Sequence, residues 1–119
     1  MRVIRVLSEI RDGICEVCNR ASVRDSAAAA IDIGFIQTQI DAGAYGWDNC
    51  KRLIVAVVGI VEQIQSPARV SRTQTQWTVL QHSIDRVEEE TDKSIVLCEA
   101  LEFLLGLVSA LRIDAANLR

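Results

Sequence analysis

The chain has 119 residues, which is enough for one compact domain and too few for two. Half of the residues are apolar but only 4% are aromatic, so any core must be built from aliphatic side chains. One proline and six glycines are too few turn residues for an all-β fold. The formal net charge is −3, with acidic and basic residues mixed along the chain, which provides no electrostatic basis for binding nucleic acid or an anionic membrane.

The N-terminus does not resemble a secretory signal. The apolar stretch that begins between Arg2 and Arg5 is interrupted at once by Ser8 and Glu9, which are too polar for the hydrophobic region of a signal peptide. We therefore expect a cytoplasmic protein whose four cysteines are reduced thiols.

Apolar residues at alternating spacings of four and three predict an amphipathic helix over about residues 2–21. The stripe consists of Val3, Leu7, Ile10, Ile14, Val17 and Ala21. A polar patch over 19–26 then indicates a break or a kink. Ser22 or Asp25 is the expected cap of a second helix over about 24–42.

Residues 41–46, which read Asp-Ala-Gly-Ala-Tyr-Gly, form the clearest loop because glycine readily ends a helix. A third helix is predicted over about 47–65. Its run 53–61 contains only apolar or small residues, and at this length it is far short of the roughly 20 residues that span a bilayer. Valine and isoleucine also favour strands, but the lack of strand-like turns favours a helix that is buried against protein on every side.

Ser66 and Pro67 mark a sharp restart, with the serine as N-cap and the proline at the first helical position. They predict a fourth helix over about 67–91. A last helix, apolar almost all round, is predicted over about 93–114.

The five segments are similar in length, which is typical of an antiparallel bundle with short connections. We therefore expect a single all-α domain over 1–119, a compact antiparallel bundle of four to five helices. If the breaks near 22 and 91 are only kinks, two pairs of helices are instead fused into long kinked helices.

Two helices without a polar face are more than one small chain readily covers, because a chain of this size leaves about a third of its unfolded-state surface exposed. We therefore expect a homo-oligomer, with a dimer favoured. Gly59 and Gly106 lie in these two helices and would allow a neighbouring helix to approach closely. The predicted interface consists of Leu53, Val57, Gly59, Leu104, Gly106 and Val108.

Acidic residues gather over 88–102, where Glu89 and Asp92, and then Glu99 and Glu102, stand three apart on one helix face. Paired carboxylates on facing helices are suited to Mg²⁺. Comparable spacings occur in helical nucleotide pyrophosphohydrolases of the MazG type. Here the pairs lie on consecutive segments without a partner motif, so the chain is not assigned to that family and a solvated acidic patch is favoured.

The remaining candidate residues give weaker indications of a functional site. Cys15 and Cys18 form a CxxC pair, but the other two cysteines are isolated, so buried thiols are favoured over a zinc or redox site. His82 is the one histidine and is expected at the surface. Tyr45 and Trp47, in and just after the loop, would either anchor a ligand or partner or close the end of the bundle.

These observations favour a non-catalytic helical interaction or assembly module, an adaptor or regulator, that acts as a homo-oligomer. Its partners would be a second copy of the chain or another protein, with no cofactor and no membrane. The alternative is a small Mg²⁺-dependent nucleotide-hydrolysing enzyme that uses the acidic cluster at 88–102. A second alternative is a helical nucleic-acid binder, which would bind through basic pairs such as Arg69 and Arg72.

Overall fold

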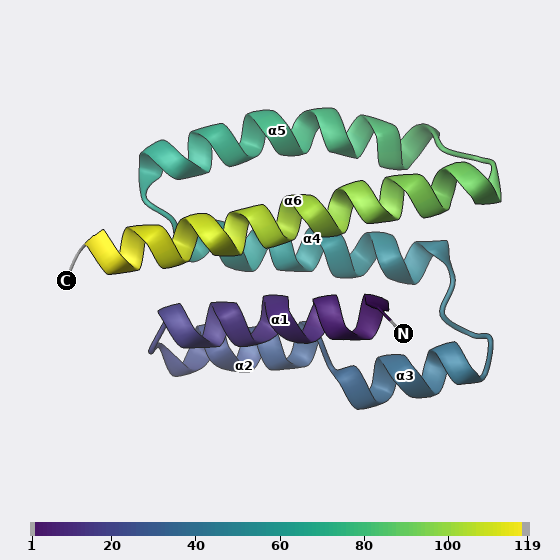
Figure 1. Ribbon diagram of the computed structural model, residues 1–119, viewed down its shortest axis with the longest axis horizontal. Coiled ribbons are helices and arrows are strands. Elements are labelled where there is room, and N and C mark those ends of the chain that lie inside the picture. The colour runs from purple at the N-terminus through teal and green to yellow at the C-terminus, as the bar shows by residue number, and fades with distance from the viewer. Residues whose placement is uncertain (1, 118–119) are drawn as a thin grey trace.

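A computed structural model describes residues 2–117, which form helices and turns without any strand (Figure 1). The prediction of an all-α helical bundle is therefore confirmed. The helices are α1 (Arg2–Val17), α2 (Ala21–Ala30), α3 (Ile33–Asp41), α4 (Trp47–Ile64), α5 (Pro67–Arg86) and α6 (Glu90–Asn117).

The helices lie nearly parallel to one long axis (Figure 1). The most extensive contact joins α1 to α6, and behind this pair α2 and α4 lie against each other. Helix α5 runs along α6, and α3 packs against α1 at one end. The radius of gyration is 14.3 Å, close to the about 13.5 Å expected for a compact chain of this length.

The chain reverses direction at both places where a break or a kink was expected. Residues 18–20 separate α1 from α2, and residues 87–89 separate α5 from α6 (Figure 1). The alternative of two long kinked helices is therefore wrong. Helix α2 starts one turn earlier than predicted and without a side-chain cap, since Arg20 stands at its N-cap.

The helix predicted over 24–42 is two helices. Ile31 ends α2 and is fully buried, and Asp32 begins α3 by accepting a hydrogen bond from the backbone N–H of Phe35 at 3.1 Å. A side chain that satisfies a free N–H of the first turn is what favours aspartate at an N-cap. The Asp32 carboxylate therefore stabilises a new helix start inside an otherwise helical pattern.

The starts of α4 and α5 agree with the sequence prediction, but α5 ends at Arg86 rather than near 91, and α6 begins at Glu90 rather than near 93. Gly43 lies just after the end of α3 with φ of 69°, a left-handed conformation that side chains other than glycine rarely adopt. Ser66 caps α5, accepting a hydrogen bond from the Arg69 N–H at 3.4 Å, and Pro67 takes the first helical position.

The apolar run 53–61 is the centre of the core on one side only. Ile54, Val57 and Val61 are fully buried, but Val55 is 51% exposed and Ala56 and Gly59 also face outward. Within one chain, the expectation that the run is buried on every side is therefore wrong. Helix α4 leaves one face of small and apolar residues open.

Helix α6 crosses the whole bundle and contacts α1, α4 and α5. Of the helices in residues 2–117, it is the one that is long and apolar enough to cross a membrane, by length and composition. Its buried residues are Val96, Ala100, Leu101, Leu104, Leu107, Val108 and Leu111. These side chains lie in the shared core, as predicted for a helix with almost no polar face.

Candidate functional site

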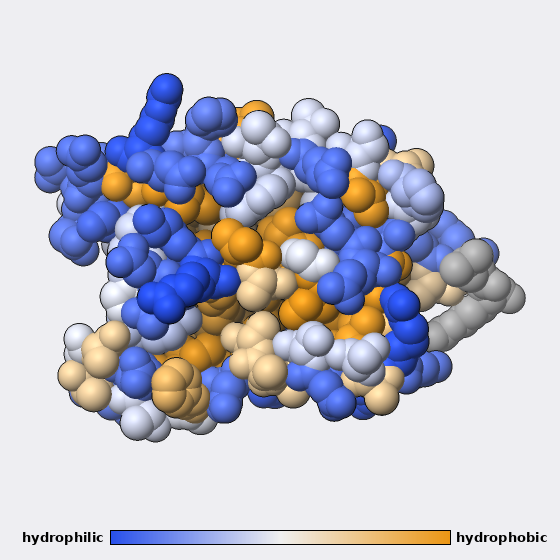
Figure 2. All heavy atoms as spheres, turned by 180° about the vertical axis from the view of Figure 1, so that it is seen from behind, coloured by the Kyte–Doolittle hydropathy of each residue, from blue (hydrophilic) through white to orange (hydrophobic). Residues whose placement is uncertain are grey.

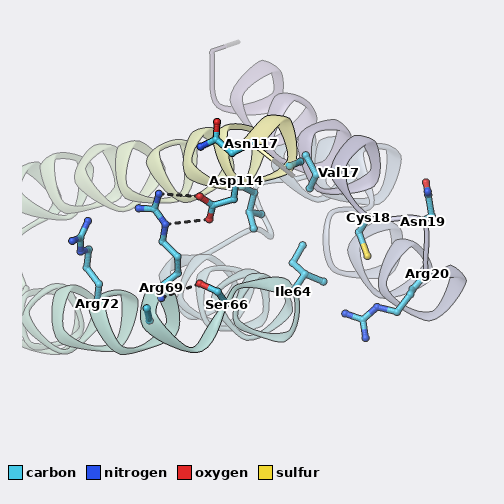
Figure 3. A pocket seen from close by; sticks show the side chains of 13 residues that line it. Val17, Cys18, Asn19, Arg20, Ile64, Ser66, Arg69, Arg72, Asp114 and Asn117 are labelled. Atoms are coloured by element: carbon cyan, nitrogen blue, oxygen red, sulfur yellow. Dashed lines mark hydrogen bonds and ion pairs between the residues drawn. The ribbon is translucent and has the colours of Figure 1, made fainter. Parts of the chain in front are cut away.

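A cavity lies at the end of the bundle where α1, α4 and α6 end and α5 begins (Figure 3). Its volume is about 740 Å³, within the range of small-molecule sites in proteins. Val17, Cys18, Ile64 and Leu111 provide its apolar lining. The polar and small lining residues are Asn19, Arg20, Ser66, Ala68, Arg69, Arg72, Asp114, Ala115 and Asn117.

Arg69 lies one turn into α5, where the Ser66 cap fixes the start of the helix. Its guanidinium reaches across the cavity to Asp114 near the end of α6 (Figure 3). Nε and Nη2 donate to the two carboxylate oxygens at 3.1 and 3.0 Å, the bidentate geometry that suits arginine. This hydrogen bonding, together with the negative charge of Asp114, raises the pKa of Arg69 above its ordinary value.

Arg20 lies on the opposite side of the cavity from Arg72 (Figure 3). Its Nη2 donates to the backbone carbonyl of Gln63 at 3.1 Å, in the last turn of α4. Carbonyls of a last turn have no partner within the helix, and a cation there also offsets the negative end of the helix dipole. Arg20 therefore acts as a C-cap for α4 that is supplied from another helix.

Two of the three arginines in this cavity thus bind groups of the protein itself. Arg72 is exposed and forms no ion pair with any residue in 2–117. Among the described residues of the lining, Asp114 is the one carboxylate, and the buried Cys18 has no histidine near it in that lining. These described residues form no acid–base pair, and the ion pair of Arg69 and Asp114 ties α5 to α6.

Four residues of the predicted interface lie inside the chain. Val57 and Leu104 are fully buried, and Leu53 and Val108 are only 8% and 2% exposed. They pack in the core between neighbouring helices and leave no surface for a second chain to contact. Continuous apolar sequence predicts burial but does not distinguish burial within a chain from burial between chains.

The two predicted interface glycines lie at the surface, on different helices. A Cβ atom added to Gly59 or to Gly106 would meet nothing within 4 Å. Close helix approach occurs instead at Gly13 of α1, where an added Cβ would collide with Val108 and touch Arg112. The sequence analysis missed Gly13 because it lies at the edge of an amphipathic stripe rather than in a fully apolar helix.

The acidic residues considered for Mg²⁺ are not brought together. Asp92, Glu99 and Glu102 lie on α6 and are exposed, and Glu89 lies in the turn before it. Among residues 2–117, no three His, Cys, Asp or Glu side chains are placed to hold a metal ion together. The CxxC cysteines are likewise separate from the other two, with Cys15 partly buried and Cys18 buried.

Tyr45 and Trp47 are both partly buried and pack against the core. Tyr45 lines a nearly apolar cavity of about 190 Å³ between α1, α3, α4 and α6. The thiol of Cys50 lines the same cavity. Burial raises the pKa of Cys50, and burial followed by the nearby Cys50 raises the pKa of Tyr45. Both groups therefore favour their neutral forms.

The exposed face of α4 is the feature that the sequence analysis did not find. We define the α4 face by the outward residues Arg52, Val55, Ala56, Gly59 and Gln63. Apolar side chains gather over the middle of this side of the molecule, between more polar rims (Figure 2). Beside Ala56, a hollow of about 240 Å³ extends the α4 face toward α2 and α3. Its lining includes Ala29, Ala30 and Phe35.

Comparison with protein-family models, with curated proteins and with solved structures finds no match to this chain. The argument about function therefore depends on the surfaces and cavities of this structure alone.

Proposed function

We propose that this protein is a non-catalytic helical interaction module that acts as a homo-oligomer, with a dimer as the favoured state. The observation that carries this proposal is the accessible surface of the single chain, 7301 Å². A compact monomer of 13.2 kDa would expose about 6,400 Å² by the usual scaling with mass. The excess of about 900 Å² belongs to the chain as a whole and is surface that a more closely packed monomer would not expose.

The character of the exposed surface supports the same proposal. Within residues 3–117, five large apolar side chains are more than half exposed: Phe35, Val55, Val79, Ile95 and Ile113. An isolated exposed apolar residue is ordinary, but a contiguous apolar area indicates contact with another molecule. On the α4 face, Val55 adjoins the exposed Ala56, and Ala56 lines the same hollow as Phe35.

The placement of the polar residues supports a non-catalytic module. His82 is exposed on α5 and does not line the 740 Å³ cavity. Arg20, Arg69 and Asp114 of that cavity each bind another part of the protein. Catalysis by proton transfer or by a nucleophile needs such groups within hydrogen-bonding reach of one another.

Light scattering on the eluate of a size-exclusion column, run over a hundredfold range of loading concentration, tests this proposal. We expect a mass of twice 13.2 kDa at the highest concentration, which falls toward the monomer mass on dilution. A mass of one chain at every concentration would refute the proposal. The same experiment separates a dimer from a larger assembly, because a heterologous contact would give masses above two chains.

The enzymatic and nucleic-acid alternatives have tests of their own. A thermal shift of several degrees with Mg²⁺ plus a nucleotide, absent with either alone, would favour the nucleotide-hydrolysing enzyme. Salt-dependent retention on heparin would favour the nucleic-acid binder. We expect neither response.

A further inference from the structure

We infer that two copies of this chain associate through the α4 face, with the two α4 helices antiparallel about a two-fold axis. This inference rests on the proposed function, because it names the partner and the surface of the self-association. The occupant of the face is a second copy, because Arg52 stands near one end of the face and Glu62 near the other, which makes the face complementary to itself in an antiparallel pair.

The composition of the α4 face is that of an interface centre. Val55, Ala56 and Gly59 carry no polar side-chain atom, and all three are exposed in the single chain. Arg52 and Gln63 lie at the two ends of this group. A small apolar centre between polar ends is the usual organisation of a protein–protein contact.

The spacing along α4 makes the face complementary to itself. Arg52, Ala56, Gly59 and Gln63 follow one another at intervals of four, three and four residues, which places them in one line along the helix. Antiparallel pairing about the midpoint of this line brings Ala56 opposite Gly59 of the second copy. The same two-fold rotation brings Arg52 of each copy opposite Gln63 of the other. The pair therefore occurs twice in the contact, as in any isologous interface.

Charges at the ends of the face support the antiparallel arrangement. Arg52 forms no ion pair within residues 2–117, and Glu62 adjoins the Gln63 that it would face. Asp48, one turn before Arg52, is ion-paired with Lys51 of its own chain at 3.5 Å, so the complementary charges are those of Arg52 and Glu62. In the antiparallel arrangement Arg52 of each copy lies near Glu62 of the other, which favours this register of the two helices.

Gly59 provides an independent argument. A glycine in the interior of a helix lowers stability relative to alanine, and nothing within the chain requires one here, since an added Cβ would meet no atom within 4 Å. A helix of a second copy that crosses at this point would gain from the missing side chain, because small residues allow helix axes to approach closely.

Val79 and Ile95, which are also exposed and apolar, lack such surroundings. Val79 of α5 has polar helical neighbours three and four residues away on both sides, namely Thr75, Gln76, His82 and Ser83. Ile95 of α6 stands between Asp92 and Glu99. Both side chains are surrounded by polar residues and do not form part of a larger apolar area. Val79 therefore provides a control for Val55 with the same residue type.

The first experiment compares Val55→Asp with Val79→Asp by sedimentation equilibrium. The two valines are 51% and 68% exposed, so neither substitution removes a core contact. We expect Val55→Asp to raise the dimer dissociation constant at least tenfold, since it places two like charges in a desolvated contact, and Val79→Asp to leave it unchanged. If both variants match a dimeric wild type, the α4 face is refuted while the proposed function stands. A monomeric wild type refutes both.

The second experiment uses two glycines in matched contexts, Gly59→Ala and Gly106→Ala. Both lie in helices, and neither would place a Cβ near any atom of its own chain. We expect both to raise the thermal stability of the monomer at low protein concentration. Only Gly59→Ala should weaken the dimer, by about tenfold. Equal dimer dissociation constants for the two variants would overturn the antiparallel α4 contact.

Discussion

The close contact between α1 and α6 makes Gly13→Ala the most informative change inside the fold. Gly13 is buried, and a methyl group there would collide with the side chain of Val108. Val108 is itself only 2% exposed and is β-branched, so it has little freedom to turn away. Either the two helices separate or Val108 leaves its preferred rotamer.

The expected magnitude follows from comparison with Gly106→Ala, where an added Cβ meets nothing within 4 Å. Both changes gain about 1 kcal/mol from the higher helix propensity of alanine. Only Gly13→Ala also suffers overpacking, which costs about 1–3 kcal/mol. The free energy of unfolding should therefore be about 1–3 kcal/mol lower for Gly13→Ala than for Gly106→Ala, or about 4–12 °C in Tm for a chain of this length.

Urea unfolding followed by circular dichroism measures this difference, at one protein concentration for all variants. The double variant Gly13→Ala with Val108→Ala provides the control, because the smaller side chain makes room for the methyl group. Its loss of stability should be smaller than the sum of the two single losses by about 0.5–3 kcal/mol. If Gly13→Ala instead stabilises the protein as much as Gly106→Ala does, the close approach of α1 and α6 is not present.

Four further predictions concern the caps and the thiols. Asp32→Ala should lower the free energy of unfolding by about 1 kcal/mol in urea, because α3 loses its N-cap, and an unchanged value would mean that the cap adds nothing. Arg20→Ala should lower the free energy of unfolding by about 0.3–1 kcal/mol, because it removes the cation from the end of α4 at Gln63. If the loss in 1 M salt is the same as the loss in low salt, its cause is not the charge. Burial raises the pKa of Cys50 above its ordinary 9.0. The neutral thiol therefore contributes fully to stability below pH 9, and this contribution is lost as the pH rises through the folded-state pKa. The free energy of unfolding should be lower at pH 10 than at pH 8, and the difference should be smaller in a Cys50→Ala variant. Iodoacetamide should label the exposed Cys98 before Cys50, and the reverse order in a peptide map would contradict the burial of Cys50.

Features that depend on neighbours in the sequence were predicted well. Ser66 and Pro67 begin α5 because the cap and the fixed φ of proline act within one turn. Gly43 ends α3 for a similarly local reason, its left-handed φ. The amphipathic stripe of α1 also predicted the buried residues Leu7, Ile10 and Ile14, since helical periodicity alone selects a face.

Features that depend on contacts between distant residues were not predicted. The Arg20 side chain binds the carbonyl of Gln63, which lies 43 positions later in the chain, and no local pattern indicates such a bond. The run 53–61 indicated burial, but which of its residues face outward depends on where α2 and α5 lie. The Asp32 cap was also not predicted, although its cause is local. An aspartate before an apolar turn is a helix-start signal, but here it lies within a longer helical pattern that concealed it.

A photo-crosslinking amino acid placed at position 55 tests the central claim most directly, since it reports which surface a second copy touches. The wild-type Val55 is 51% exposed, so the probe can be accommodated without disturbing the core. We predict a crosslinked dimer whose joined peptides both come from α4, and no such dimer when the probe replaces Val79. A dimer that crosslinks equally well from both positions, or crosslinks that join position 55 only to other helices, would contradict the account.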